Sequence, residues 1–266
     1  ILVGGGGDDT IYGGAGNDQI YIFGTNATAN GGADFDYILV LRLGTGSNIT
    51  INGDAGTDIL VGQDAVDTIN GGDDFDQIYG GAGGDILSGN AGTDYIYGQA
   101  DGDTINGNDG EDVLYGEDGD DIIDGGLDYD LMQGGLGNDT IRAGADAATT
   151  VNALIGNEGN DTLVGGGGID YMWGWLQGGA SDTGNDIFEV AANGGVDVIL
   201  DFQSGAGVGD VLRLVGTGNT SFAQMQGAGQ FVEVGTYVGV IVSAGNVVYL
   251  ANTTIAQLAA DDFQFV

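Results

Sequence analysis

The chain has 266 residues, of which 40 are Asp or Glu and three are Lys or Arg, so its formal net charge is −37. Such a chain lacks the cations that a protein needs to bind phosphate groups, which excludes nucleic acid and disfavours an anionic membrane surface as partners. It has no cysteine and no histidine, which excludes disulfides, thiolate nucleophiles and a histidine base. Because 42% of the residues are hydrophobic, the chain can fold, provided that positive charge comes from outside.

A nine-residue pattern begins near the N-terminus, with GGGGDDTIY at residues 4–12 and GGAGNDQIY at residues 13–21. Another copy covers residues 31–39. Residues 22–30 keep the nine-residue count without the motif, whereas residues 40–52 break the phase. Strand-like pieces such as Ile49-Thr50-Ile51 remain there, so we predict coils with lengthened turns.

The longest uninterrupted part of the pattern runs from Gly53 to Arg142 and holds ten copies. Residues 143–155 interrupt it, and two further copies begin at Gly156 and Gly165. Each copy ends in aspartate, any residue, an apolar residue and any residue. A three-residue strand and a six-residue turn would make half a coil, so two copies would complete one coil.

The pattern G-G-x-G-x-D-x-U-x, in which U is apolar, resembles the RTX (hemolysin-type calcium-binding) family over residues 1–173. The resemblance implies an all-β fold, a calcium-stabilised parallel β-roll with two sheets. Neighbouring coils lie about 4.8 Å apart, which brings the aspartate of one coil near the carbonyls and aspartate of the next. Because Ca²⁺ prefers carboxylate and carbonyl oxygens, multiple calcium sites are expected between copies n and n+2.

The candidate metal ligands share the sixth position of the pattern. They are Asp9, Asp18, Asp36, Asp58, Asp67, Asp76, Asp85, Asp94, Asp103, Asp112, Asp121, Asp130, Asp139, Asp161 and Asp170. Aspartate also replaces glycine at the fourth position in some copies (Asp34, Asp74, Asp101, Asp128), where it adds a ligand or only charge. The alternative is that these aspartates are turn formers alone.

The eighth position is apolar in every copy of the uninterrupted block, and its side chains should point inward. One such residue per strand is a thin core, while ordering each residue costs about 1–2 kcal/mol of backbone entropy. Calcium would therefore supply both charge neutralisation and the missing free energy, so that binding and folding are one event.

The residues on either side of the inward position should face outward, alternate copies contributing to opposite sheets. One outer face is rich in tyrosine (Tyr79, Tyr95, Tyr97, Tyr115) and the other is mixed and polar. The tyrosine face is either covered by a partner, including a second copy of the chain, or consists of strand residues stacked as neighbours.

The pattern fades after Trp173, and we predict a second region, residues 174–266, that is β-rich and caps the roll. Six strands are expected, at 186–190, 196–202, 210–215, 231–234, 238–242 and 247–250. Two short helices are expected at 221–226 and 254–260, each with Ser or Thr in the N-cap position. Segments such as VDVILDFQ and TIAQLAADDFQFV resemble the C-terminal cap of RTX proteins exported by type I secretion, which implies a secretion signal within Ala259–Val266.

Three functions fit these features. The first is a secreted calcium-binding module that folds on extracellular calcium and has a structural role in an adhesin, surface layer or filament. The second is the calcium-binding and secretion tail of a secreted enzyme whose catalytic domain lies upstream of residue 1. The third, catalysis by these residues, is disfavoured, although Tyr171, Trp173 and Trp175 suit either a sugar-binding platform or strand packing. We expect a protein that is not itself an enzyme and has no membrane span.

Overall fold

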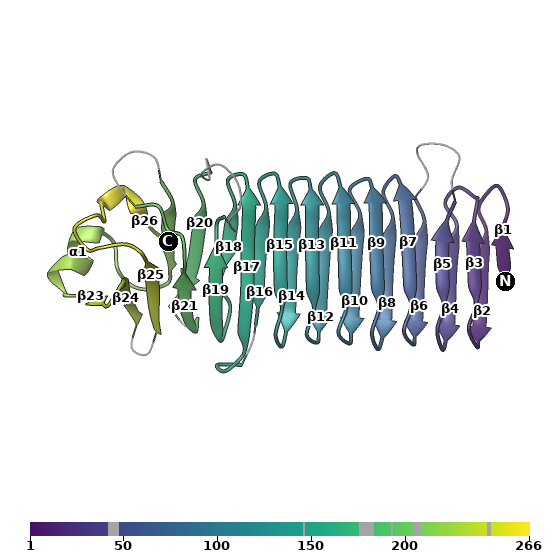
Figure 1. Ribbon diagram of the computed structural model, residues 1–266, viewed down its shortest axis with the longest axis horizontal. Helices are drawn as coiled ribbons and strands as arrows, with labels where there is room; N and C mark the ends of the chain where they lie inside the picture. The colour runs from purple at the N-terminus through teal and green to yellow at the C-terminus, as the bar shows by residue number, and fades with distance from the viewer. Residues whose placement is uncertain (42–47, 146, 176–183, 193, 205–208, 244–245) are drawn as a thin grey trace. The chain divides into compact units, whose positions relative to one another are not determined.

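The computed structural model describes residues 1–41, 48–145, 147–175, 184–192, 194–204, 209–243 and 246–266. The chain divides into two compact units, Ile1–Met132 and Gln133–Val266, and strand β15 (Leu131–Leu136) runs across their boundary. Each unit consists mainly of β-strands that alternate between two sheets (Figure 1).

In the first unit, odd-numbered strands form one parallel sheet and even-numbered strands form the other. The first sheet contains β1 (Leu2–Gly4), β3 (Gln19–Ile22), β5 (Tyr37–Val40), β7 (Ile59–Asp64), β9 (Gln77–Ala82), β11 (Tyr95–Ala100) and β13 (Val113–Asp118). The second contains β2 (Thr10–Ala15), β4 (Thr28–Ala33), β6 (Thr50–Ala55), β8 (Thr68–Asp73), β10 (Ile86–Ala91), β12 (Thr104–Asp109) and β14 (Ile122–Leu127).

In the second unit the same alternation continues and then ends in an antiparallel hairpin. One sheet has the order β17 (Val151–Glu158), β19 (Ile169–Trp173), β21 (Val196–Ile199), β25 (Asn246–Ala251), β24 (Tyr237–Ser243) and β23 (Phe231–Val234). The other has the order β16 (Thr140–Gly144), β18 (Thr162–Val164), β20 (Ile187–Ala191), β22 (Val211–Val215) and β26 (Phe263–Phe265). The predicted all-β parallel roll is confirmed.

The register follows the nine-residue pattern. Tyr95 of β11 lies beside Gln77 of β9 and Val113 of β13, so partners are two copies apart. The strands are longer than predicted, typically six residues instead of three, because the first three residues of the next copy stay extended and continue the ladder. β4 and β6 pair in parallel across the interruption at 40–52, so strands flank it as expected, whereas the predicted lengthened turn includes residues 42–47, which lie outside the described residues.

The apolar eighth position forms the core, as predicted. Its side chains are completely buried: Leu60, Ile69, Ile78, Leu87, Ile96, Ile105, Leu114, Ile123, Met132 and Ile141. The next inward position is a glycine in nine of these ten strands and Ala143 in β16, so each of them contributes one large side chain to the interior.

The C-terminal strands match the predicted ones to within a few residues. The first short helix is also confirmed as α1 (Phe222–Gly227), with the Ser221 side chain accepting a hydrogen bond from the Gln224 backbone N–H. The second predicted helix, 254–260, is wrong. The Thr254 hydroxyl donates a hydrogen bond to the side chain of Gln257, and the chain forms only a turn here before a short 3₁₀-helix, η1 (Ala260–Asp262).

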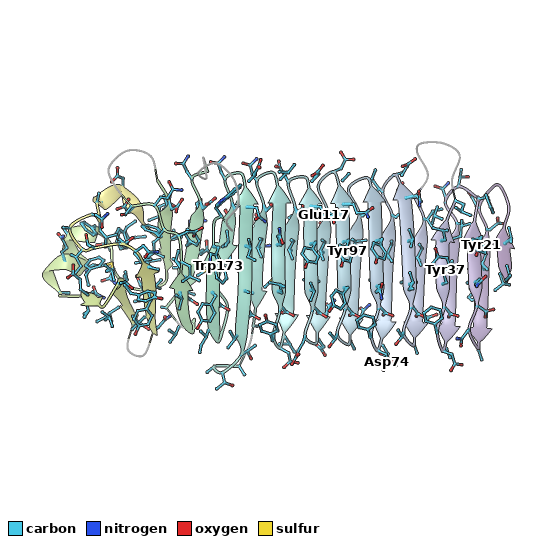
Figure 2. All side chains as sticks on the ribbon, in the orientation of Figure 1. Tyr21, Tyr37, Asp74, Tyr97, Glu117 and Trp173 are labelled. Carbon is cyan, nitrogen blue, oxygen red and sulfur yellow. The ribbon has the colours of Figure 1, made fainter. Side chains whose placement is uncertain are left out.

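The two outer faces of the first unit differ in the way their side chains interact. The rings of Tyr79, Tyr97 and Tyr115 stack along one sheet, with centroids 5.1 Å apart in both pairs, and Figure 2 labels Tyr97 on this face. On the other sheet, the amide of Asn70 donates to Asn52, which donates to Asn30, at 2.9 Å in each case. The stacking agrees with the interpretation of these tyrosines as neighbours within one sheet. Covering of this face by a partner stays a prediction.

Candidate metal sites

The predicted aspartates lie immediately before a strand or at its start, on the same side as the buried apolar residue. Thirteen of the fifteen are at most 1% exposed, and Asp9 and Asp18 at the N-terminus are half-buried. Burial of so many carboxylates is unusual, since an ionised carboxylate is rarely buried without a partner of opposite charge.

In the two columns of the first unit, one carboxylate oxygen of an aspartate accepts a hydrogen bond from the neighbouring coil. Asp76 Oδ1 accepts a hydrogen bond of 2.8 Å from the backbone N–H of Asp58, and Asp94 Oδ1 accepts one of 2.8 Å from Asp76. The donor and acceptor are 18 residues apart, which is two copies of the pattern. Two such columns run through the first unit. One joins Asp18, Asp36, Asp58, Asp76, Asp94, Asp112 and Asp130, and the other joins Asp67, Asp85, Asp103 and Asp121.

The second column also shows what an interruption does. The residue that donates to Asp67 Oδ1 is Ile49, through its backbone N–H at 2.9 Å. Ile49 and Ala27 stand where an aspartate would be, and both are buried. The copy that contains Ile49 therefore keeps the coil and this hydrogen bond but contributes no carboxylate.

The other oxygen of these carboxylates is buried without a donor. Within the part of the chain that the structure describes, Oδ2 has no hydrogen-bond partner in Asp36, Asp58, Asp76, Asp94, Asp103 and Asp112. A buried oxygen that carries negative charge and meets no donor is costly. A bound cation removes that cost, so these atoms have the property expected of metal ligands.

The pKa values of these groups point in the same direction. Burial raises the pKa of Asp76 and Asp103 to about 8 and that of Asp58 and Asp112 to about 7, and neighbouring carboxylates add to the increase. The backbone hydrogen bond at Oδ1 opposes the shift in each case without cancelling it. Near pH 7 the protein must therefore bind either protons or cations at these positions.

The space beside each Oδ2 exists because the first residue of the copy is glycine. A Cβ at Gly80 would lie 2.6 Å from Asp85 Oδ2 and 2.8 Å from the carbonyl oxygen of Gly98 on the next coil. A carboxylate oxygen and a main-chain oxygen thus converge on one small volume, and both are oxygen ligands of the kind that Ca²⁺ prefers. In the described residues no three His, Cys, Asp or Glu side chains gather at one point, so a cation here would need main-chain carbonyls as ligands.

The turns between strands bring further carbonyls together. Gly92, with φ of +141°, stacks so closely that a Cβ would overlap the carbonyl group of Asp74 on the preceding coil. Asp74 replaces glycine at the fourth position with φ of 77°, and its side chain is exposed at the end of the coil (Figure 2). Asp34, Asp101 and Asp128 are exposed in the same way. Their positions favour surface charge over a ligand role.

Two aspartates that the sequence analysis missed extend a column beyond the repeats. In the second unit, Asp161 Oδ1 accepts from the backbone of Asp139, Asp186 from that of Asp161, and Asp210 from that of Asp186, at 2.8–3.0 Å. Both Asp186 and Asp210 are at most 2% exposed. The signal was the ending of the pattern alone, DIFE at 186–189 and DVLR at 210–213, which survives after the glycines are lost.

The aromatic residues Trp173 and Trp175 line a cavity of about 350 Å³ together with Leu200, Asp201 and Phe202. The ring of Tyr171 stacks on Trp173 at 6.3 Å, and Asp201 accepts a 2.6 Å hydrogen bond from the backbone N–H of Trp175. Both interpretations of these aromatics, a ligand platform and strand packing, thus have a structural counterpart.

Comparison with known proteins identifies the family. The RTX calcium-binding nonapeptide repeat (4 copies) matches residues 1–21, 43–78, 61–96, 70–105, 97–132, 130–147 and 155–199, which is more than half of the chain. The chain therefore belongs to the RTX calcium-binding repeat family, whose repeats bind Ca²⁺ at multiple sites.

A solved structure and the curated sequences add little. The crystal structure of the extracellular lipase LipA from Serratia marcescens matches with 16% sequence identity and a TM-score of 0.30. The match covers 94% of this chain but only 45% of the lipase chain, so residues 1–266 span less than half of that protein. No curated protein matches the chain.

Proposed function

We propose that this chain is a secreted module that folds when it meets extracellular calcium and then acts as a structural element in an adhesin, surface layer or filament. The observation that carries the proposal is the set of buried carboxylates whose second oxygen lacks a donor. The chain has only three Lys and Arg residues against 40 acidic ones, so its own side chains cannot neutralise these groups.

Calcium concentration would control folding. Where calcium is scarce, repulsion among carboxylates keeps the chain extended, a state suited to threading through a type I secretion transporter. Extracellular calcium modules bind with dissociation constants of about 10⁻⁴–10⁻³ M, so outside the cell the sites fill and the coils close. The described residues contain no helix long and apolar enough to cross a membrane.

The region after Trp173 is proposed to cap the roll and to carry the export signal. Two features support a cap: the antiparallel hairpin β24–β25 at the end of one sheet, and the packing of Phe222 and Phe231 on Phe263 with centroids 5.0 and 5.6 Å away. The proposed signal, Ala259–Val266, includes β26, which pairs with β22 in the folded chain. A receptor could read this segment as an extended peptide only before folding is complete.

The assembly role is assigned to the tyrosine face formed by Tyr79, Tyr95, Tyr97 and Tyr115. Tyr95 is 37% exposed although it is a large aromatic residue. Replacing Tyr79, Tyr97 and Tyr115 with Thr should abolish self-association in sedimentation velocity while calcium binding persists. Unchanged association of the triple variant would remove this face from the proposal.

The central experiment is a calcium titration of the chelated 266-residue chain. Far-UV circular dichroism should show β-structure appearing cooperatively at submillimolar to millimolar calcium, while native mass spectrometry counts the bound ions. Magnesium at the same concentration is the control, because its stricter octahedral geometry and slow dehydration disfavour sites built from carbonyls. A chain that is fully folded after exhaustive chelation would contradict the proposal.

A further inference from the structure

Both tryptophans of the chain, Trp173 and Trp175, line the same cavity in the second unit. Together with Tyr171 they occupy every second position along β19 and just beyond it, and all three residues are at least partly exposed. Met172, which lies between two of them, is buried. Because alternate residues of a strand face opposite sides, the aromatic residues form a row on the outer side (Figure 2 labels Trp173).

The cavity beside this row is too large to be a packing defect. Its volume is about 350 Å³, whereas protein interiors contain few voids larger than a water molecule, which occupies about 30 Å³ in the liquid. Small-molecule sites typically have volumes of about 300–1,000 Å³. Phe202 gives the cavity a firm wall, because it is 5% exposed and its ring lies 6.1 Å from that of the buried Phe188. Strand packing accounts for the row of rings but not for this space.

One carboxylate in the cavity holds the segment that carries the tryptophans. Asp201 Oδ1 accepts a 3.0 Å hydrogen bond from the backbone N–H of Gly174, and its Oδ2 accepts a 2.6 Å bond from that of Trp175. A carboxylate offers about four acceptor positions, so Asp201 has the capacity to accept from hydroxyl groups of a ligand as well. Asn252, an exposed residue, also lines the cavity, and an asparagine amide both donates and accepts.

The ring geometry distinguishes between two classes of ligand that bind to aromatic residues. A quaternary ammonium ion favours a cage of rings that surround it. The rings of Tyr171 and Trp173 are instead only 28° from parallel, with centroids 6.3 Å apart, so they form a platform. A sugar ring suits a platform, because its weakly positive C–H groups lie against the negative face of an aromatic ring. The formal net charge of −37 disfavours an anionic saccharide.

We propose that Trp173, Trp175 and Asp201 form a binding site for a neutral saccharide built from hexopyranose rings. The two indoles stack on a sugar ring, and Asp201 accepts hydrogen bonds from its hydroxyl groups. Tyr171 extends the platform to the next ring of an oligosaccharide. This binding activity goes beyond the structural role proposed above, and it depends on neither the tyrosine face nor self-association.

The test is isothermal titration calorimetry of the calcium-saturated 266-residue chain with three neutral hexasaccharides, cellohexaose, maltohexaose and mannohexaose. At least one should bind, and Trp175→Ala should weaken its affinity about tenfold or more, as is common for a tryptophan in a binding site. The matched control is Tyr12→Ala, which removes an aromatic ring that is 69% exposed in the first unit and should leave the affinity unchanged.

Three results would overturn the proposal. The first is the absence of binding by all three hexasaccharides at millimolar concentration, and the second is an equal loss of affinity in Trp175→Ala and Tyr12→Ala. The third is binding of tetramethylammonium, but of no hexasaccharide, that Trp175→Ala abolishes, which would assign the cavity to a cation.

A measurement on the unmodified protein covers the case in which Trp175→Ala fails to fold. Because the chain has only these two tryptophans, a saccharide bound at the site should shield its tryptophan fluorescence from quenching by acrylamide. Binding without shielding would place the saccharide elsewhere and overturn the proposal. A chain that binds no calcium would refute the proposed function, whereas a calcium-folded chain that binds no saccharide would refute only this inference.

Discussion

The repeat strands of the first unit and the strands after residue 186 bury very different side chains. A repeat strand such as β11 contributes Ile96 and then a glycine to the interior, whereas β20 contributes Phe188 and Val190, and β22 contributes Leu212 and Leu214. A fully buried aliphatic or aromatic side chain stabilises a fold by about 1.5–3 kcal/mol. The C-terminal strands can thus rely on hydrophobic burial, while the repeats depend on what neutralises their aspartates.

Polar pairing differs in the same way. In the C-terminal part, Arg213 forms an ion pair with Glu189 at 3.0 Å and a hydrogen bond with Gln264, across three adjacent strands. In the repeats, the carboxylates of Asp76 and Asp103 meet a backbone N–H on one oxygen only. The comparison teaches that strands in the same alternating order can bury either a column of aspartates or pairs of apolar side chains.

The largest expected effect is selective unfolding on chelation. Removing calcium should abolish most of the far-UV β signal, because the repeat strands lose their counter-ions. Both tryptophans, Trp173 and Trp175, lie in the second unit, so their fluorescence reports on that unit. It should change at a lower free calcium concentration than the circular dichroism does. Coincident transitions of the two probes would break the comparison.

Acid should partly replace calcium in the chelated chain. The folded-state pKa values of about 7 for Asp58 and about 8 for Asp76 lie above the ordinary value of 3.8, so the folded chain binds more protons than the unfolded one between these limits. Stability is therefore gained as the pH falls from about 8 towards about 4, and lost as it rises. Circular dichroism in the presence of a chelator should show β-structure increasing on acidification.

Calcium should reverse that dependence. With the sites filled, the folded carboxylates are ionised, and protons compete with the metal as the pH falls. Thermal unfolding at saturating calcium should thus show stability declining in acid. The acid prediction for the chelated chain would be contradicted if that chain lost structure on acidification. Such a result would show that the buried carboxylates are not the groups that destabilise it.

A single column residue should behave in opposite ways with and without calcium. Asp103→Asn should lower stability in calcium by about 1–3 kcal/mol, the range for losing a buried charge-assisted interaction. In a chelator the same variant should be more stable than the unmodified chain, since one buried charge is gone. Denaturant unfolding under both conditions measures the two signs.

The matched control lies two residues earlier. Asp101→Asn removes the same charge from an exposed turn position with φ of 74°, which asparagine also tolerates. It should change stability little under either condition. Equal effects of Asp101→Asn and Asp103→Asn would mean that net charge, and not the column, determines the response.

The smallest expected effect concerns backbone strain in one turn. Ala65 has φ of 88°, where most copies have glycine. Ala65→Gly should raise stability by roughly 0.5 kcal/mol, because relief of left-handed strain of about 1–2 kcal/mol exceeds the entropic cost of glycine. Ala82→Gly, in strand β9, should instead lower stability by about 0.5–1 kcal/mol. Chemical denaturation in calcium distinguishes the two signs.

Much of the fold could be predicted because the sequence repeats its own rule. The inward position of Ile78 and the approach of Asp76 to the aspartates of neighbouring coils follow from the nine-residue period. Strand length could not be read in the same way, since glycines are poor strand formers and only pairing with neighbouring coils keeps them extended. Asp186 and Asp210 continue the column of hydrogen-bonded aspartates. They were missed because the glycine pattern that marks the repeats is absent around them.

The region 254–260 shows a different limit. Thr254 has the side chain of a helix cap, and its Oγ1 interacts with Gln257 at 2.7 Å. The chain nevertheless turns once and then extends into β26, whose pairing with β22 buries Phe263. The helix-cap signal of Thr254 was overridden by the pairing of β26 with β22, a strand some fifty residues earlier in the chain. A short sequence pattern does not encode such a distant pairing.

Because consecutive nine-residue copies alternate between two sheets, the length of an insertion or deletion determines its consequences. Loss of eighteen residues would shorten the roll by one coil and return every downstream strand to its own sheet. Loss of nine would transfer each downstream strand to the opposite sheet, so that Tyr97 and Tyr115 would join the asparagine face. The protein can thus change its length by whole coils during evolution while its two surfaces stay distinct. Gain or loss of an odd number of nine-residue copies would mix the two surfaces.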